Sequence, residues 1–200
     1  YAMLEYCIRE DLKMKRSRMM AVLDPIKLVI DNYPEGQTEM LEVPNNLENP
    51  ELGMKKVPFG RELYIDREDF AEVPPPKFFR MKPGGEVRLM GAYIVRVDEI
   101  LTDADGNITE VRGKADLETG NGMPADGRKV KGTIHWLSVP HAVDLTLHLY
   151  NNLITLENPS DKSDDKEYSD FINPESLIVE TGAKGEPALA DAKPGDKFQF

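Results

Sequence analysis

Apolar and polar residues alternate over short stretches along most of the chain. The clearest stretches are residues 61–66, 86–97, 131–138 and 143–150. A period of two places successive side chains on opposite faces and is typical of strands that bury one face. Clusters of proline, glycine and asparagine separate the stretches and favour turns. The pattern predicts an all-β protein, with a hairpin at the turn Asp-Ala-Asp-Gly-Asn of residues 103–107.

Residues 2–15 follow a different period. Leu4, Cys7, Ile8 and Leu12 recur at helical spacing, in a window without glycine or proline. We therefore expect one short helix near the start of the chain. In 200 residues, many short strands after a single helix fit two small β-barrels better than one.

The charge of the chain is unevenly distributed. Its formal net charge of −11, from 25 basic and 36 acidic residues, argues against nucleic-acid binding by bulk electrostatics. The acidic side chains concentrate in residues 157–196, however, whereas residues 13–18 and 77–96 are basic. The sequence is therefore compatible with a local basic surface on an acidic protein.

Nothing in the sequence predicts membrane association or export. No run of about 18 apolar residues occurs, and the first residues lack the charged leader and apolar core of a signal peptide. Cys7 is the only cysteine and cannot form an internal disulfide. We expect a cytoplasmic protein without a membrane partner.

The residues that most often perform catalysis or bind metals lack the required arrangement. His135, His141 and His148 lie in or beside predicted strands, where satisfied hydrogen bonds explain them better than acid–base catalysis. Residues 103–110 contain three acidic side chains, but their spacing is not that of a calcium-binding loop. We expect no catalytic residue, no metal ligand and no cofactor site in this chain.

Basic and aromatic side chains are interleaved in part of the sequence, at Arg18, in Lys-Phe-Phe-Arg of residues 77–80 and at Arg88. Unstacked RNA bases bind aromatic faces, and arginine contacts phosphates and base edges, so this mixture is typical of single-stranded RNA recognition. The alternative is an ordinary solvated face. Residues 126–132 allow two interpretations, a basic turn that contacts an RNA phosphate and a turn that leads into the next strand. The two interpretations are compatible.

Four longer strings carry a resemblance to a known family. They are residues 20–33 (MAVLDPIKLVIDNY), 57–70 (VPFGRELYIDREDF), 126–136 (DGRKVKGTIHW) and 172–177 (INPESL). Together and in this order they resemble the C-terminal anticodon-binding region of glutaminyl-tRNA synthetase, a class I aminoacyl-tRNA synthetase, over nearly the whole chain. The archaeal and eukaryotic glutamyl-tRNA synthetases share the architecture but fit the strings less well.

The resemblance implies a fold and a function. The expected parts are a helical connector end at residues 1–18, a proximal β-barrel at 19–112, and a distal β-barrel with the start of a return strand at 113–200. The intact enzyme would be a glutamine–tRNA ligase that uses ATP with magnesium to attach glutamine to tRNA(Gln). Its catalytic domain is expected upstream, since neither a HIGH-type nor a KMSKS-type ATP motif occurs here. The implied partners are the anticodon loop of tRNA(Gln) and that catalytic domain, with no DNA partner and a monomeric state.

The same resemblance implies a set of RNA-binding residues. By position these are Arg18, Lys77, Arg80, Arg88 and Gln199. In the family the three anticodon bases are splayed into pockets between the barrels. Arg18 and Gln199 are expected at the middle base. Arg80 is expected at the third base and a phosphate, and Arg88 near the first base.

Departures from the family pattern keep other functions open. Lys77 and Phe79 stand where the best-known members carry glutamine and lysine, and Met90 replaces a second arginine after Arg88. The first alternative is an all-β protein-interaction domain that no longer recognises RNA. The second is the corresponding domain of a glutamyl-tRNA synthetase. If the three expected arginines face one concave surface, RNA recognition is favoured over protein interaction, whereas their scattering on unrelated faces would exclude RNA recognition.

Overall fold

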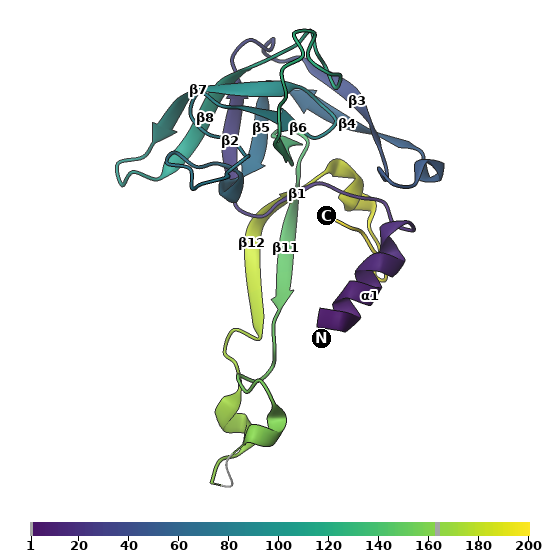
Figure 1. Cartoon of the computed structure of the whole chain (residues 1–200), viewed down its shortest axis with the longest axis vertical. Helices are drawn as coiled ribbons and strands as arrows, with labels where there is room; N and C mark the ends of the chain where they lie inside the picture. The colour runs from purple at the N-terminus through teal and green to yellow at the C-terminus, as the bar shows by residue number, and fades with distance from the viewer. Residues whose placement is uncertain (1, 163–164) are drawn as a thin grey trace.

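A computed structural model describes residues 2–162 and 165–200 of the chain. A body of short strands carries a long projecting hairpin, and one helix lies beside that hairpin (Figure 1). The all-β class with a single N-terminal helix, predicted from the alternation, is confirmed. The helix is α1 (Ala2–Lys13), and the strands are β1 (Ala21–Val22), β2 (Pro25–Ile30), β3 (Thr38–Pro44), β4 (Met54–Gly60), β5 (Glu62–Asp66), β6 (Glu86–Leu89), β7 (Ile94–Thr102), β8 (Ile108–Ala115), β9 (Thr133–Ile134), β10 (Leu137–Ser138), β11 (Val143–Tyr150) and β12 (Leu177–Gly185). Short 3₁₀ helices occupy Pro50–Leu52, Arg67–Asp69, Pro159–Asp161, Tyr168–Phe171 and Pro187–Asp191.

The largest sheet has seven strands in the order β10-β5-β2-β8-β7-β6-β9, and β3 pairs separately with β4. The predicted alternation is visible in β5, where Leu63 and Ile65 are buried between less buried neighbours. The buried faces meet around Phe59, whose ring lies 5.0–5.2 Å, edge to face, from the rings of Tyr33, Tyr93 and Trp136. Such aromatic contacts add to the burial of apolar surface that stabilises the body.

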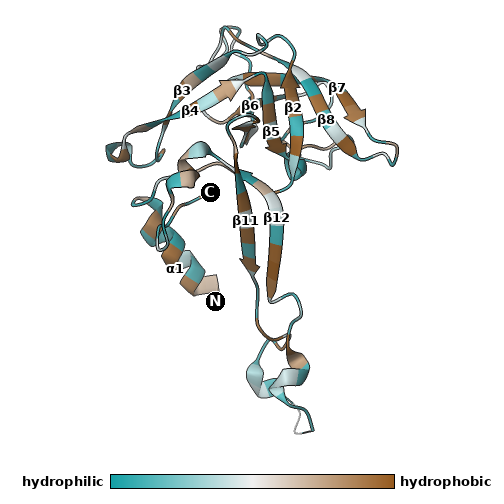
Figure 2. Ribbon diagram, turned by 180° about the vertical axis from the view of Figure 1, so that it is seen from behind, coloured by the Kyte–Doolittle hydropathy of each residue, from teal (hydrophilic) through white to brown (hydrophobic). Residues whose placement is uncertain are grey.

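The hairpin of β11 and β12 belongs to a second sheet. The two strands pair antiparallel along their length, and β1 pairs with the end of β12 that lies nearest the body. Figure 2 shows that hydrophobic residues continue along this hairpin away from the body. Large apolar side chains there are exposed. They include Leu149, Tyr150, Leu177, Ile178 and Val179. The hairpin therefore buries little of its own apolar surface.

Two stretches predicted as single strands are interrupted. The prediction of one strand at residues 86–97 is wrong, because a turn at Gly91 separates β6 from β7. Gly91 has a φ of +66°, and a Cβ there would lie 2.3 Å from Cγ1 of Val43. Both the backbone conformation and the packing require glycine. Residues 131–138 likewise divide into β9 and β10.

The predicted division into two barrels at residues 112–113 stays a prediction. Strand β8 crosses this position, and β9 and β10 from beyond it pair with β6 and β5 of the first sheet. Residue 1 of the predicted connector and residues 163–164 of the predicted distal barrel lie outside the described residues. Within the described part of the chain, no helix is both long and apolar enough to cross a membrane.

Candidate nucleic-acid interface

The chain that follows α1 is fixed by the loop between β3 and β4. Asn46 Nδ2 donates hydrogen bonds to the carbonyl oxygens of Lys13 and Arg16 at 2.8 and 2.9 Å, and Asn49 Nδ2 donates to that of Met14 at 2.7 Å. Carbonyl groups at the end of a helix have no partner within the helix and need such donors. The two asparagines therefore set the direction in which the chain leaves α1 toward residue 18.

Arg18 and Gln199 lie side by side, as the resemblance implies. They form a parallel β-bridge, in which Met19 N donates to the carbonyl of Gln199 at 2.8 Å. Arg18 Nη2 lies 3.2 Å from Glu48 Oε1. Arg18 Nε and Gln199 Oε1 are buried and have no hydrogen-bond partner among the described residues. Since buried polar atoms are usually paired, this donor and this acceptor are exceptions within the described part of the chain.

Both residues line a cavity of about 510 Å³, here called the apolar cavity. Its volume falls within the range of roughly 300–1,000 Å³ that is usual for small-molecule sites. Met90 and Gly91, from the turn between β6 and β7, form part of the wall, and Trp136 Nε1 holds this turn through the Met90 carbonyl at 2.9 Å. The remaining lining residues are Met19, Met20, Val43, Pro44, Leu47, Lys55, Asn121, Thr133, His135 and Phe200.

A buried ion pair supports this cavity from below. Glu186 is 1% exposed, and its carboxylate accepts hydrogen bonds from Lys55 Nζ at 2.7 and 2.8 Å and from Met20 N at 3.0 Å. Lys55 Nζ also donates to the carbonyl of Arg18 at 2.6 Å. The pair therefore joins β4, the segment after α1 and the end of β12 at the residue expected to bind the middle base.

His135 also lines the apolar cavity. Burial lowers the pKa of its imidazole, with a hydrogen bond to the backbone of Ala21 acting in the opposite direction. The side chain is therefore neutral at pH 7. Within the described residues, no group of three or more histidine, cysteine, aspartate or glutamate side chains could hold a metal ion. His135 is a polar group in the wall of the cavity.

Arg80 lines a second cavity of about 420 Å³, here called the basic cavity. Its five cationic side chains are Arg80, Lys82, Arg96, Lys129 and Lys131, against Glu86 as the one acid of the lining. Arg80 Nη1 pairs with Asp69, whose pKa is raised because burial outweighs this arginine. Phe79 is 52% exposed at the same cavity, with Lys131 Nζ 5.1 Å from its ring centroid.

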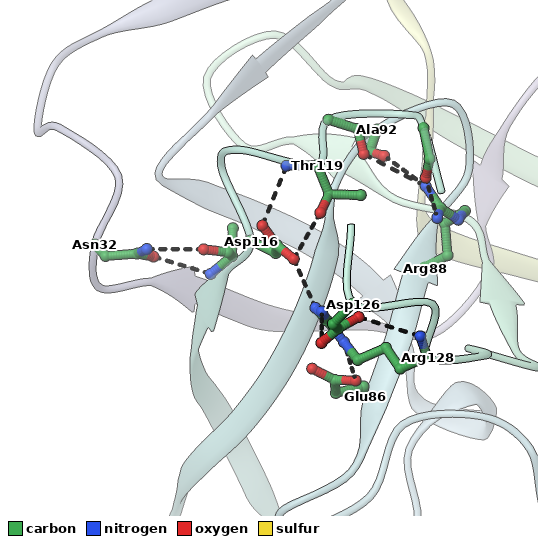
Figure 3. A network of polar contacts seen from close by, with 11 residues as sticks. Asn32, Glu86, Arg88, Ala92, Asp116, Thr119, Asp126 and Arg128 are labelled. Atoms are coloured by element: carbon green, nitrogen blue, oxygen red, sulfur yellow. Dashed lines mark hydrogen bonds and ion pairs between the residues drawn. The ribbon is translucent and has the colours of Figure 1, made fainter. Parts of the chain in front are cut away.

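Arg88 and Lys77 line neither cavity. The Arg88 guanidinium donates to the carbonyl oxygens of Ala92, Gly120 and Gly122, at 3.5, 3.4 and 2.7 Å, and so holds a loop (Figure 3). Lys77 is exposed and has a φ of +65°, a conformation that favours glycine. The structure thus joins Arg18 with Gln199, places Arg80 at a neighbouring cavity, and leaves Arg88 and Lys77 apart. Their proposed roles in RNA binding stay predictions.

The arginine and the lysines of the turn at residues 126–132 have different surroundings. Arg128 pairs with Glu86, Asp116 and Asp126 at 3.0, 2.6 and 2.8 Å (Figure 3). Hydrogen bonds from Thr119 and Arg128 lower the pKa of Asp116 to about 2. The arginine of the turn therefore fixes the loop, whereas the lysines on either side of Val130 line the basic cavity. The sequence indicated a basic turn but not which cations are engaged.

The two cavities lie on one continuous segment of chain. Residues 129–132 line the basic cavity, and Thr133 and His135 line the apolar one. The single concave surface expected for Arg18, Arg80 and Arg88 is not found: Arg18 lines the apolar cavity, Arg80 lines the basic one, and Arg88 lines neither. Lys82, Arg96 and the two lysines of the turn share the basic cavity with Arg80.

Comparison with known proteins assigns both ends of the chain to one type of domain. A family model described as the anti-codon binding domain of class I (E and Q) tRNA synthetases matches residues 17–116, and a second model with this description matches residues 133–200. The whole chain is 51% identical to the glutamine–tRNA ligase of Xanthomonas campestris pv. campestris and 48% identical to that of Pseudomonas syringae pv. tomato. It spans about a third of the length of these relatives, 34% and 35%.

Proposed function

We propose that this chain recognises the anticodon of tRNA(Gln). The premise is that it belongs to the anticodon-binding domains of the class I (E and Q) tRNA synthetases. The observation that supports this most directly is that Arg18 and Gln199 both line the apolar cavity and each have a buried polar atom without a partner, Nε and Oε1. A guanidinium N–H donates and an amide oxygen accepts. Uracil offers the complementary pair, a carbonyl oxygen and an N3–H, whereas cytosine carries an unprotonated N3.

The apolar lining supports recognition of a base rather than of a phosphate. Methionine, valine and leucine side chains surround the two polar atoms, and an unstacked base needs apolar contact on its faces. A phosphate in this place would lose its hydration without sufficient positive charge to replace it. We assign the middle base to the apolar cavity, and the third base with its phosphate to the neighbourhood of Arg80.

The proposal for the whole protein is a glutamine–tRNA ligase. The relatives bear that name, and the chain covers about a third of each. A catalytic domain outside this chain would use ATP with magnesium to attach glutamine to tRNA(Gln), in the cytoplasm and as a monomer. The present domain would contribute the choice of tRNA, and its own residues would perform no chemical step.

The test is binding of the protein to a tRNA(Gln) anticodon stem-loop and to a copy in which the middle U is replaced by C. We expect tighter binding of the U form by about 5- to 150-fold, the effect of one good bidentate contact in DNA recognition. Arg18→Ala should remove this preference. Arg9→Ala, which removes the same charge from an exposed position on α1, should preserve it. Equal binding of both loops by the unaltered protein would contradict anticodon recognition and favour a protein-interaction domain.

A further inference from the structure

We propose that the basic cavity is a phosphodiester site, in which Lys129 and Lys131 bind the backbone of the RNA strand and Phe79 receives the adjacent base. This rests on the proposed function and assigns residues that the family resemblance does not assign. Five cations line a cavity of about 420 Å³ in a protein of net charge −11. Such a local concentration of one sign attracts a ligand of the opposite sign.

The lysines of this cavity are the cations without a carboxylate partner. Arg80 pairs with Asp69, and Arg96 lies 3.8 Å from Asp98. Across the described residues, by contrast, no ion pair engages Lys82, Lys129 or Lys131. The one carboxylate of the lining, that of Glu86, pairs with Arg128, so the three ammonium groups at this cavity repel one another. A phosphate from outside the protein relieves this repulsion.

The aromatic side of the cavity is held in place by backbone packing. A Cβ on Gly132 would lie 1.7 Å from the carbonyl oxygen of Phe79, so only glycine allows the two segments to approach this closely. The carbonyl of Gly132 accepts a hydrogen bond from Arg88 N at 2.9 Å, which fixes the segment against β6. Lys131 and Phe79 are therefore presented together, and a lysine next to an exposed ring is suited to a phosphate next to a base.

Single-stranded RNA provides this combination of groups. Stacking on an aromatic side chain tolerates any base, and phosphate contacts carry no sequence information. The site should therefore add affinity without adding discrimination. This separates it from the apolar cavity, where a matched donor and acceptor select one base.

The first test replaces both lysines by glutamine in the Lys129→Gln/Lys131→Gln variant. With the tRNA(Gln) anticodon stem-loop, we expect weaker binding and a log–log salt dependence that is shallower by about 0.7 for one single-strand phosphate contact. The loss of affinity should be the same for stem-loops with U or C as the middle anticodon base. The control is Lys56→Gln/Lys193→Gln, which removes equal charge from exposed positions outside both cavities, and its salt dependence should stay unchanged.

The second test is Phe79→Leu, which removes the ring and keeps the charge. We expect binding weaker by about 5- to 150-fold, as for the loss of one base–aromatic stack, with an unchanged salt dependence. The proposal is overturned if the double lysine variant binds like its control, or if its loss depends on the middle base. Failure of the proposed function is a different result, since the unaltered protein would then bind U and C loops equally whatever the lysine variant does.

Discussion

The two cavities have similar volumes and opposite linings. The apolar cavity, about 510 Å³, is lined largely by methionines and aliphatic side chains, and two of its lining residues, Arg18 and Gln199, each have a buried polar atom without a partner. The basic cavity, about 420 Å³, has five cations and an exposed phenylalanine. The first offers hydrogen-bonding groups beside apolar side chains, and the second offers charge and an aromatic face. On the proposals above, base selection and affinity would be separated along the chain between residues 129 and 135.

On the proposed function, this separation would explain how an acidic protein binds RNA selectively. Phosphate contacts contribute most of non-specific binding and depend strongly on salt. A net charge of −11 weakens this contribution everywhere except at a local basic surface. On the proposed function, the buried hydrogen-bonding groups would determine which RNA is bound, because a mismatched base would leave them unpaired.

The largest expected effect comes from removing the ion pair beneath the apolar cavity. Glu186→Ala leaves Lys55 without its counter-charge and Met20 N without its acceptor. We expect a loss of about 3–5 kcal/mol in the free energy of unfolding, measured by urea denaturation, as is usual when one partner of a buried pair is removed. Middle-base selection should decline with it, since Lys55 also holds the Arg18 carbonyl.

The matched control for this change is Asp144→Ala. Its partner is Lys184, but the aspartate side chain is 84% exposed. An exposed pair contributes less than about 1 kcal/mol. Equal losses in the two variants would mean that the Lys55–Glu186 pair does not support the cavity.

The second-largest expected effect comes from Gly132→Ala, which should disrupt the basic cavity and leave the apolar cavity intact. Gly132→Ala introduces a Cβ that would lie 1.7 Å from the Phe79 carbonyl oxygen. We expect a loss of about 1–3 kcal/mol in thermal or urea unfolding, the usual cost of overpacking. Binding of the stem-loop should weaken equally for U and C in the middle.

Gly60→Ala is the comparison for this variant. The nearest atom to its Cβ, the carbonyl oxygen of Gln37, lies at 3.3 Å, so a small shift accommodates the methyl group. The loss of stability should be smaller than for Gly132→Ala. A change in the U-over-C preference caused by Gly132→Ala would show that the two cavities are not independent.

Local features of this molecule were predictable from the sequence, and contacts between distant segments were not. Alternation predicted the strands, and the hairpin at residues 103–107 is confirmed, since Asp103 Oδ1 accepts from Asp105 N and Asn107 N within the turn itself. The turn at Gly91 was missed because its cause, the close approach of Val43, comes from another sheet.

In the candidate site, too, some features were predictable from the sequence and contacts between distant segments were not. The resemblance to the glutaminyl-tRNA synthetase family is confirmed by the matching family models and by the 51% identity, and it placed Arg18 beside Gln199. The acidic stretch at residues 157–196 gave no sign that Glu186 is buried, because its partner Lys55 is 131 residues away. Arg88 was expected near a base, and its engagement with the Gly120 and Gly122 carbonyls depends on a loop whose path alternation does not predict.

The smallest expected effect concerns the loop that supplies residues to both cavities, Asn121 to the apolar one and residues 129–132 to the basic one. Asp116 fixes this loop by accepting hydrogen bonds from Thr119 and Arg128, which lower the pKa of its carboxyl from 3.8 to about 2. Because the folded-state pKa is the lower one, the stabilisation is fully present above about pH 4 and is lost as the pH falls to about 2. Asp116→Asn should therefore lower the stability at pH 7 by less than about 1 kcal/mol and flatten its dependence on pH between 4 and 2.

Asp126→Asn is the control for this last change, since it removes a second carboxylate from the same arginine at a side chain that is 58% exposed. Urea unfolding at several pH values should show a smaller change than Asp116→Asn, because water already solvates Asp126 in the folded protein.

If Asp116 alone determines the path of the loop, both cavities should respond together when its carboxylate is removed, with weaker RNA binding and weaker selection of the middle base. A response of only one cavity would mean that the loop is held independently at its two ends, by Arg88 near Gly122 and by Arg128 near Asp126.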